Sequence, residues 1–591
     1  MKTKRLILFS LITCITASAA EKIDRGLVAL PAGANKIYLS WRLLRDDATD
    51  IAFNIYRQPA AGGKAFKLNV QPVSQTTDFI DSTAPVDIAC EYFVRGVIAG
   101  RESEASSKCA ATASTKDPVI KKDSKKPAAP EAAFVSIPLL GKYKAQSVAV
   151  ADLDGDGKVD FVIKQPDGNI DPYKDYWHKS TGTFKLEAYG HDGKPLWQYD
   201  LGWGIEQGIW YAPYIVHDFD GCGKAEVVVK TSEGDPRDQD GHVQTGPEYL
   251  TVLDGTTGKE ICHADWPGRD LFKEEGYNHA SRNQLGVAYL DGKTPSIIIN
   301  RGTYGHLIVE AWKFHDRKLE RQWRWDNKSL PKQYQGQGSH MLQAADLNGD
   351  GRDEIIVGSC VIGPDGKELW TTGLGHPDSV YVGKLNPDRK GLQIYYNIET
   401  AQKSNGMCQV DAATGKLLWG YNTPTKHVHS HGLCSDIDPD QPGWEGYGAE
   451  STNHVFVYSR LWSSTGKLLD DSLRWSFGPF AVLWDGTPQR ELIFNDRITK
   501  YKGAAINAVE GNFLAVADVQ GDWREEILAS VPGELRIYTT TIPAHDRRVW
   551  LMQDPIYRNC VARQTSGYYQ CPTLSFDPAT GATRNLSLIH I

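Results

Sequence analysis

Eight times along the chain, a turn rich in Asp or Gly runs directly into a short apolar strand. The clearest copy covers residues 152–160 and leads into Phe161-Val-Ile, and two further clear copies begin at Asp218 and Asp346. Fainter copies begin at Tyr289, Gly383, Ser435, Leu483 and Ala517. Recurrence of one short unit in this way is typical of a repeat architecture.

A second turn, with Asp-Gly or Thr-Gly at its centre, follows most of these units. Examples are residues 191–197, 365–370 and 411–419, each ending in Leu-Trp or Pro-Leu-Trp. Both dipeptides supply the positive φ angles that tight hairpins require. Two turns and several short strands per unit describe a four-stranded blade. The eight units therefore predict an all-β protein with an eight-bladed β-propeller over residues 134–580.

A different pattern precedes the repeats. Residues 37–41, 52–57 and 92–97 alternate between apolar and polar positions and are bounded by turn residues, which predicts a small β-sandwich over residues 21–112. The Trp followed by an Asn-x-Tyr-Arg strand resembles a fibronectin type III domain. Residues 113–133 are polar, charged and Pro-rich, and they indicate a linker.

The first 20 residues have the pattern of a secretory signal peptide. Met1-Lys-Thr-Lys-Arg5 is followed by an apolar run and by Ala17-Ser-Ala19, so we expect a secreted or periplasmic protein. Lipidation at Cys14 is a minor alternative. No later run is long enough to span a membrane as a helix.

Composition narrows the choice of partners. The formal net charge of −8 argues against a basic nucleic-acid-binding face and fits acidic metal-binding loops. The 17 Trp and 26 Tyr suit an all-β protein. Nine cysteines remain after removal of a signal peptide, and Cys90 with Cys109 and Cys560 with Cys571 are the local candidates for disulfides.

The acidic turns place oxygen atoms at positions 1, 3, 5 and 9 of a loop, which is a spacing used by Ca²⁺ sites. The predicted loop ligands are Asp152, Asp154, Asp156, Asp160, Asp218, Asp220, Glu226, Asp346, Asn348, Asp350, Glu354, Asp436, Asp438, Asp518 and Asp522. Cys222 occupies an oxygen position in the second loop. These loops resemble the calcium loops of integrin-type propellers, and we interpret them as scaffolding for blade corners.

The candidate functional residues lie outside the repeat pattern. They are placed just before innermost strands or at strand ends. His340, His376, Asp378 and Glu399 are predicted to converge on the central funnel of the propeller, where they could ligate one metal ion. By ligand type alone, Zn²⁺ or Mn²⁺ is favoured over Ca²⁺. Separate hydrogen-bonded histidines are the alternative.

Three histidines alternate with other residues along one short segment, at positions 427, 429 and 431. In an extended strand this spacing puts three imidazoles on one face. Three roles remain possible for this segment: binding a metal ion, acting as a general base, or binding the substrate.

Several motifs together resemble family 11 polysaccharide lyases, the rhamnogalacturonan lyases. They include residues 24–29, 39–43, 52–57, 246–252, 336–338, 372–376, 521–526 and 551–558. The resemblance covers nearly the whole chain from Asp24 to about Pro572. It implies an N-terminal β-domain, an eight-bladed propeller rich in Ca²⁺, and secretion.

The resemblance also implies a role for the His/Asp/Glu cluster. In that family two His, an Asp and a Glu hold Ca²⁺ in the central cleft, and these positions match His340, His376, Asp378 and Glu399. A cation there can neutralise a uronate carboxylate, which acidifies the C5 proton and favours β-elimination.

The sequence departs from the family pattern at two cationic catalytic positions. His431 stands where the family has Arg, and residues 509–513 lack the family Lys. Gln146 replaces an Asn, whereas Tyr568 matches the sugar-binding set. Three explanations are open: His429 or His431 acts as the base, the uronate substrate differs, or the chain binds sugar without cleaving it.

We therefore predict a monomeric, secreted, Ca²⁺-dependent lyase that cleaves an acidic polysaccharide similar to rhamnogalacturonan I. His431 is the predicted base and His429 its substitute. Tyr568 is the predicted substrate contact. Further substrate-binding positions are Gln146, Glu510, Gly511 and Asn512. The alternatives are a lyase for a rhamnose–glucuronate linkage, a non-catalytic calcium-dependent carbohydrate-binding propeller, and a hydrolase that uses a carboxylate pair such as Asp378 and Glu510.

Overall fold

The computed structural model describes residues 22–123, 125–429, 432–452, 455–472 and 478–579. Nearly all regular structure in these ranges consists of antiparallel strands. The helices are α1 (Gly276–Ala280), α2 (Pro555–Ala562) and the short 3-10 segments η1 (Arg269–Phe272), η2 (Asn327–Ser329), η3 (Lys332–Tyr334), η4 (Leu551–Gln553) and η5 (Arg563–Thr565). None of the described helices is long and apolar enough to cross a bilayer. The predicted signal peptide lies outside the described residues.

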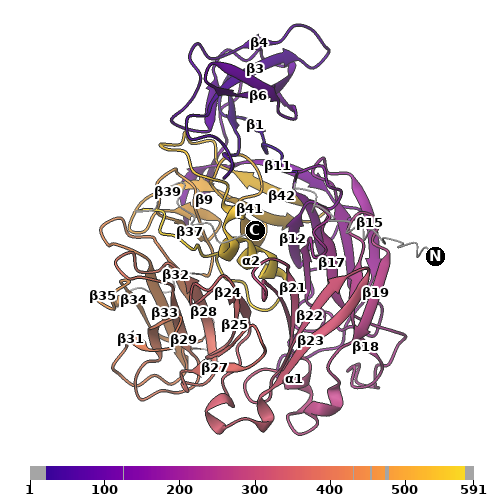
Figure 1. Ribbon diagram of the computed structural model, residues 1–591. Coiled ribbons are helices and arrows are strands. Elements are labelled where there is room, and N and C mark those ends of the chain that lie inside the picture. Colours follow the sequence, from indigo (N-terminus) through magenta and orange to yellow (C-terminus); the bar gives the residue numbers. More distant parts are fainter. Residues whose placement is uncertain (1–21, 124, 430–431, 453–454, 473–477, 580–591) are drawn as a thin grey trace, which may run out of the picture.

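The N-terminal unit consists of two sheets packed around one apolar core. One contains β1 (Val28–Pro31), β2 (Ile37–Ser40) and β5 (Asp78–Asp81); the other contains β3 (Ala52–Pro59), β4 (Phe66–Lys67), β6 (Ala89–Ile98), β7 (Arg101–Ala105) and β8 (Cys109–Thr112). Trp41, Phe53 and Tyr92 are fully buried between them. The two sheets form the narrow upper part of the molecule in Figure 1.

Eight four-stranded antiparallel sheets follow in the described part of the chain, and Figure 1 shows them fanned around α2. The first four consist of β12 (Ser147–Ala151), β13 (Asp160–Gln165), β14 (Lys185–Tyr189) and β15 (Pro195–Asp200); β16 (Tyr214–His217), β17 (Glu226–Ser232), β18 (Glu248–Leu253) and β19 (Glu260–Asp265); β20 (Asn283–Ala288), β21 (Ser296–Arg301), β22 (Ile308–His315) and β23 (Lys318–Asp326); β24 (Leu342–Ala345), β25 (Glu354–Val357), β26 (Cys360–Ile362) and β27 (Glu368–Thr371).

The next three sheets continue the same order. They consist of β28 (Pro377–Gly383), β29 (Gln393–Ile398), β30 (Met407–Asp411) and β31 (Leu417–Gly420); β32 (Leu433–Ser435), β33 (Glu445–Thr452), β34 (Val455–Trp462) and β35 (Leu468–Asp470); β36 (Ala481–Val482), β37 (Glu491–Phe494), β38 (Arg497–Thr499) and β39 (Ala505–Ala508). The eighth sheet joins β40 (Asn512–Ala517), β41 (Glu526–Val531) and β42 (Glu534–Thr539) to β11 (Ala133–Pro138), so the two ends of the repeat region meet in one sheet.

Each of the eight predicted acidic turns connects the first and second strands of one sheet. A recurrent hydrogen bond closes several of these turns, because the carboxylate that begins the second strand accepts a backbone N–H from the turn. Asp160 accepts from Leu153 at 2.9 Å, and Glu226 accepts from Phe219 at 2.9 Å. Glu354, Glu445 and Glu526 repeat the bond in their own sheets.

Helix α2 packs against the first strands of five sheets, β12, β16, β20, β24 and β40. It begins at Pro555, and its N-cap Asp554 accepts a hydrogen bond from the Tyr557 backbone N–H at 2.9 Å. The Tyr557 hydroxyl donates to Glu525, which also pairs with Arg490 at 2.7 Å. This buried network ties the helix to the seventh and eighth sheets.

The stretch 113–133 is more ordered than a Pro-rich linker suggests. It contains a hairpin of β9 (Ile120–Asp123) and β10 (Lys126–Pro130), which packs against β39. Lys126 pairs with Asp496, and Glu131 forms a parallel bridge with Ala508. These tertiary contacts fix a segment whose composition alone favours disorder.

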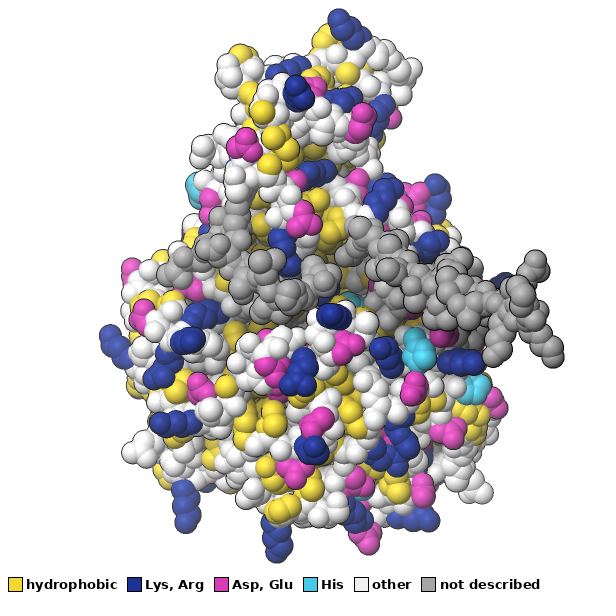
Figure 2. Space-filling model, viewed as in Figure 1, with side chains coloured by type: hydrophobic (Ala, Val, Ile, Leu, Met, Phe, Trp, Pro, Cys, Tyr) yellow, Lys and Arg dark blue, Asp and Glu magenta, His cyan; other side chains and the backbone are white. Residues whose placement is uncertain are grey.

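The nine cysteines of the described residues are all free, so the two suggested disulfides are absent from them. Strand register explains one case, because Cys109 lies opposite Tyr92 and Cys90 opposite Ala111. Figure 2 shows Lys and Arg interspersed with Asp and Glu on the visible face, without a basic patch that would suit nucleic acid.

Candidate metal centre and surrounding site

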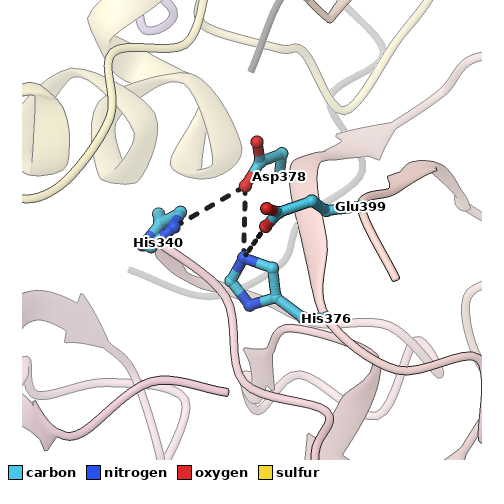
Figure 3. Close-up of side chains that lie close together, drawn as sticks. All are labelled: His340, His376, Asp378 and Glu399. Carbon is cyan, nitrogen blue, oxygen red and sulfur yellow. Dashed lines mark hydrogen bonds and ion pairs between the residues drawn. The ribbon is translucent and has the colours of Figure 1, made fainter. Parts of the chain in front are cut away.

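Two His and two carboxylates from neighbouring sheets meet in one small cluster (Figure 3). His340 lies in the loop before β24, and His376 directly precedes β28. Asp378 is the second residue of β28, and Glu399 follows β29. The side chains converge because β28 and β29 pair in one sheet and β24 begins the sheet before it. His340, His376 and Asp378 lie at the start of their strands and Glu399 at the end of the antiparallel β29.

The distances between the ligand atoms of the cluster suit a metal site. Nε2 of His376 lies 3.1 Å from Oδ1 of Asp378 and 3.0 Å from Oε2 of Glu399. Nε2 of His340 lies 3.6 Å from the same Asp378 oxygen. One ligand atom from each of the four residues can be chosen so that all lie within 4.8 Å of one another.

The electrostatics of the cluster favour a bound cation. Burial lowers the pKa of His340 well below its ordinary value, so its ring is neutral and available as a ligand. Burial opposes protonation of His376, but hydrogen bonds with Asp378 and Glu399 raise its pKa to about 9. Burial also disfavours the anion of Asp378, yet His376 holds its pKa well below the usual range. The donor set, two imidazoles and two buried carboxylates, therefore fits a divalent cation.

Aromatic side chains surround the cluster. The Tyr304 hydroxyl lies 3.2 Å from Nε2 of His340, and its ring lies 4.1 Å from that of His376. The Trp210 ring packs against His340 at 4.9 Å and against Tyr568 at 5.0 Å. Tyr568, predicted as a substrate contact, lies 4.7 Å from His340 between ring centroids. Tyr304 and Tyr568 are half-buried and form an aromatic wall of the site, whereas Trp210 is fully buried.

A buried guanidinium supports that wall from behind. Arg282 lies 4.7 Å from the Trp210 ring centroid and pairs with Asp171 at 2.9 Å. The Trp210 indole N–H also donates to Asp171, at 3.2 Å. Trp210, Tyr304, Arg282 and Asp171 were not among the site residues predicted from the sequence. Arg282 immediately precedes β20, so the rule that selected His376 would also have selected it.

The histidine segment borders the cluster. Nε2 of His427 lies 2.7 Å from Oε1 of Glu399, and Nε2 of His429 lies 3.9 Å from Oδ2 of Asp378. Both side chains are about one-third exposed. His431, the predicted base, lies outside the described residues.

The other predicted substrate residues lie in and near the turn between β39 and β40. Glu510 pairs with Arg536 at 3.2 Å, and Asn512 donates to Asp167 at 3.3 Å. Gly511 between them has φ +115°, a conformation that favours glycine. Gln146 precedes β12, and its backbone N–H donates to Lys164.

Phe513 lies in the segment 509–513, which contains no Lys. Its ring packs against Phe480, with 5.9 Å between the ring centroids.

The predicted calcium loops differ in how well their ligand atoms converge. Ligand atoms of Asp152, Asp154 and Asp160 lie within 4.8 Å of one another, as do those of Asp218, Asp220 and Cys222. Four of the predicted ligands have protein partners. Asn348 donates to Glu354 at 2.8 Å, Asp350 pairs with Arg352 at 2.8 Å, Asp156 pairs with Lys158 at 3.3 Å, and Asp522 pairs with Arg524 at 2.7 Å.

Burial raises the pKa of carboxylates in several of the acidic loops. It raises the pKa of Glu226 to about 8, that of Glu354 to about 7 and that of Asp436 to about 8, and neighbouring carboxylates add to each shift. Burial likewise raises the pKa of Asp518 well above its ordinary value. Asp438 lies close to Asp436 and contributes to its shift. A cation would relieve this repulsion.

Comparison with known proteins places this geometry in a family. The profile of rhamnogalacturonan lyase family 11, C-terminal domain, matches residues 130–585, and that of the rhamnogalacturonan I lyase beta-sheet domain matches residues 18–112. The chain is 36% identical to rhamnogalacturonan endolyase YesW of Bacillus subtilis (strain 168), covering 95% of this chain and 91% of the relative. It is 34% identical to rhamnogalacturonan exolyase YesX of the same organism, covering 95% of both chains.

Solved structures agree with this assignment. The crystal structure of YesW matches with a TM-score of 0.83 at 35% identity, covering 95% of this chain and 97% of that chain. Bacillus licheniformis rhamnogalacturonan lyase PL11 matches with a TM-score of 0.83 at 32% identity, covering 95% and 98%. Fold and sequence thus define a polysaccharide lyase. The chain belongs to rhamnogalacturonan lyase family 11.

Proposed function

We propose that this protein is a secreted, calcium-dependent lyase that cleaves a rhamnose- and uronate-containing polysaccharide similar to rhamnogalacturonan I. The observation that carries the proposal is the buried cluster of His340, His376, Asp378 and Glu399, which presents four ligand atoms within 4.8 Å beside an aromatic wall. The relatives named as rhamnogalacturonan endolyase and exolyase support the substrate class.

The fold proposal is that the eight four-stranded sheets are the blades of a β-propeller over residues 134–580. The two-sheet unit before them is proposed to be fibronectin type III-like, with residues 113–133 as the connection. Support comes from the order of the sheets and from the eighth sheet, in which β11 pairs with β42.

The site residues suggest how the chain would promote β-elimination. Bound at the cluster, Ca²⁺ would neutralise the uronate carboxylate and so acidify the C5 proton. We assign proton removal to His431, with His429 as its substitute, because a neutral imidazole accepts a proton near pH 7. The C5–H electron pair forms the C4–C5 double bond, and the glycosidic oxygen leaves from C4. Water is not consumed.

Other residues in the proposal position the sugar chain. Tyr568, which is partly exposed, would pack against a sugar ring beside His340, and the buried Trp210 ring would hold Tyr568 in position. Gln146, Glu510, Gly511 and Asn512 would contact the substrate farther along the chain. The hydrogen bond of Asn512 with Asp167 links this group to the loop that carries Asp171 and supports Trp210.

Further parts of the proposal concern calcium, location and assembly. We propose Ca²⁺ in the loop that begins at Asp152, where carboxylate oxygens converge. In the loop that begins at Asp218 the Cys222 thiol takes an oxygen position, so we expect weak Ca²⁺ binding or none there. Residues 1–20 are proposed to be a signal peptide, which would direct the protein out of the cytoplasm as a monomer.

One assay tests the activity. The protein is incubated with rhamnogalacturonan I, ulvan or gum arabic, with Ca²⁺ or with EDTA, and the ultraviolet absorbance of 4,5-unsaturated uronate is followed. We expect a rise with rhamnogalacturonan I that EDTA abolishes and Ca²⁺ restores. A rise with ulvan or gum arabic alone would instead favour a rhamnose–glucuronate linkage. Binding without cleavage of any polymer would contradict the proposal.

A further inference from the structure

Two carboxylates in the site each face two different pairs of histidines. We name His340 and His376 the inner pair and His427 and His429 the outer pair. Oδ1 of Asp378 faces the inner pair, at 3.1 and 3.6 Å, whereas its Oδ2 faces His429 of the outer pair at 3.9 Å.

Glu399 repeats this division. Its Oε2 lies 3.0 Å from Nε2 of His376 in the inner pair, and its Oε1 lies 2.7 Å from Nε2 of His427 in the outer pair. Both carboxylates therefore offer one oxygen to each pair. This is the arrangement in which carboxylates bridge two metal ions.

The outer pair forms a ligand set of its own. Ligand atoms of Glu399, His427 and His429 lie within 4.8 Å of one another, and the two imidazole centroids are 4.8 Å apart with the rings tilted by 33°. Nδ1 of His427 lies 3.4 Å from the Ser451 hydroxyl. That contact directs the opposite ring nitrogen, Nε2, toward Glu399.

The segment that carries the outer pair is held in place by its backbone. Val428, between the two histidines, is fully buried against Met407 and Trp462 and forms an antiparallel bridge with Glu450. The Ser451 backbone N–H donates to the His427 carbonyl at 3.0 Å. The two rings are thus set on one side of a fixed segment before any ligand arrives.

We propose that the outer pair, with Glu399 and Asp378, holds a second divalent cation, so that the two carboxylates bridge two ions. Two imidazole ligands favour a borderline ion such as Zn²⁺ over Ca²⁺ at the outer position. The outer imidazoles are about one-third exposed, which leaves ligand positions open to water or to an anionic group. Carboxylate-bridged ions of this kind lie about 3.5–4 Å apart.

The second ion offers a physical reason for the departures from the family pattern. The resemblance seen in the sequence implies an Arg and a Lys where this chain has His431 and a Lys-free segment 509–513, so two expected positive charges are missing. A divalent cation at the outer pair restores that charge next to the inner site. The inference rests on the cation site of the proposed function but not on the identity of the polysaccharide.

Anomalous diffraction tests the second site directly. Crystals of the full chain are grown with Ca²⁺ and soaked in Zn²⁺, and maps are compared above and below the zinc edge. We expect a zinc peak between Oε1 of Glu399 and the outer pair, about 3.5–4 Å from a second peak at the inner pair. A filled inner site with no density at the outer pair would overturn the inference. Absence of both peaks would instead refute the cation site of the proposed function.

A solution titration supplies a readout independent of lyase activity. The double variant His427→Asn/His429→Asn should bind one Co²⁺ fewer per chain than the wild type, with loss of the visible absorption bands of nitrogen-ligated Co²⁺. The matched variant His315→Asn changes an exposed histidine on β22 and should keep the wild-type stoichiometry. Equal stoichiometry in wild type and double variant would contradict the inference. The wild-type crystal map tests it even if the double variant fails to fold.

Discussion

Among single residues, Asp378 and Glu399 matter most for the chemistry of the site, because each carboxylate contacts more than one histidine. Asp378 is buried and Glu399 is half-buried, and both contact Nε2 of His376, so their charges favour a compensating cation. His376 lies within 3.1 Å of an oxygen of each carboxylate and supplies part of that charge only when protonated. A divalent cation supplies it without the proton and leaves both imidazoles as ligands.

Replacement of Glu399 tests the role of the shared carboxylate. We expect Glu399→Gln to lower the rate of polysaccharide cleavage by about 100-fold or more, because it removes one of two anionic ligands. The rate is measured by the ultraviolet absorbance of the product. Glu368→Gln, an exposed change on β27, should leave the rate unchanged. A Glu399→Gln variant with wild-type rate and calcium affinity would contradict the assignment.

Lys164 predicts a pH dependence of stability. Its side chain is fully buried and donates to the Ala212 carbonyl at 2.8 Å, and burial lowers its pKa to about 7. Between about pH 7 and 10.5 the unfolded chain holds a proton that the folded chain lacks. Stability therefore rises with pH across this window, by up to about 1.4 kcal/mol per pH unit.

The test compares thermal unfolding of the wild type and Lys164→Met at pH 7 and at pH 10. The wild type should gain stability relative to the variant as the pH rises, because the variant has no proton to lose. Lys416→Met, an exposed change, should follow the wild type. Parallel pH profiles for Lys164→Met and the wild type would show that Lys164 keeps its ordinary pKa.

The four cluster residues could be predicted from the sequence because they lie next to strands whose boundaries are marked by repeated turns. Sequence patterns missed Trp210, which lies in the loop between β15 and β16, and Tyr304, which lies in the loop between β21 and β22. The path of such loops is set by tertiary contacts, such as the Trp210–Asp171 hydrogen bond, that no local pattern encodes. Tyr304 also has a φ of +55°, which is uncommon for a bulky residue.

Among the structural elements, the acidic turns have two functions: they join paired strands, and their carboxylates are the predicted cation ligands. Every one of the eight predicted turns joins two paired strands of a sheet. In most of them a carboxylate residue at the end of the turn begins the next strand. The hairpin β9–β10 was not predicted. Its charged, Pro-rich sequence indicates a linker, and its order comes from distant partners such as Asp496.

Asp154→Asn tests whether the first acidic turn binds Ca²⁺. The side chain is exposed, and its Oδ1 accepts the Asp156 backbone N–H at 3.1 Å, a role that Asn can also fill. We expect unchanged thermal stability in EDTA and a smaller increase on addition of Ca²⁺. Binding at 100 times the dissociation constant contributes about 2.7 kcal/mol at a single site.

Differential scanning fluorimetry with and without Ca²⁺ measures this increment. Asp365→Asn, in an exposed hairpin turn outside the predicted loops, should keep the full increment. An undiminished increment in Asp154→Asn would remove Asp154 from the set of ligands.

At the scale of the whole molecule, two long-range contacts define the architecture. Strand β11 pairs with β42 and joins the start of the sheet region to its end. The N-terminal unit contacts the same region through Arg42, whose guanidinium lies 3.9 Å from the Trp550 ring centroid and donates to the Val519 carbonyl at 2.7 Å. Sequence patterns predicted both units but not their contact, because the partners are far apart in the chain.

Arg42→Ala should uncouple the two units. Loss of the ring contact and the hydrogen bonds removes about 2–3 kcal/mol from their interface. In calorimetry we expect the wild type to unfold in one transition and the variant to show an earlier transition of the N-terminal unit. Arg101→Ala, an exposed change on β7, is the control. A single unshifted transition in Arg42→Ala would show that the interface does not couple the units.

The mass of the products tests the central claim most directly. An oligosaccharide of alternating rhamnose and galacturonate is digested in ¹⁸O-labelled water with Ca²⁺, and the fragments are weighed by mass spectrometry. β-Elimination adds no water, so we predict fragments whose masses sum to that of the parent, without ¹⁸O, one of them carrying an unsaturated uronate. EDTA should prevent their formation. Fragments that carry one ¹⁸O and no double bond would show hydrolysis and contradict the account.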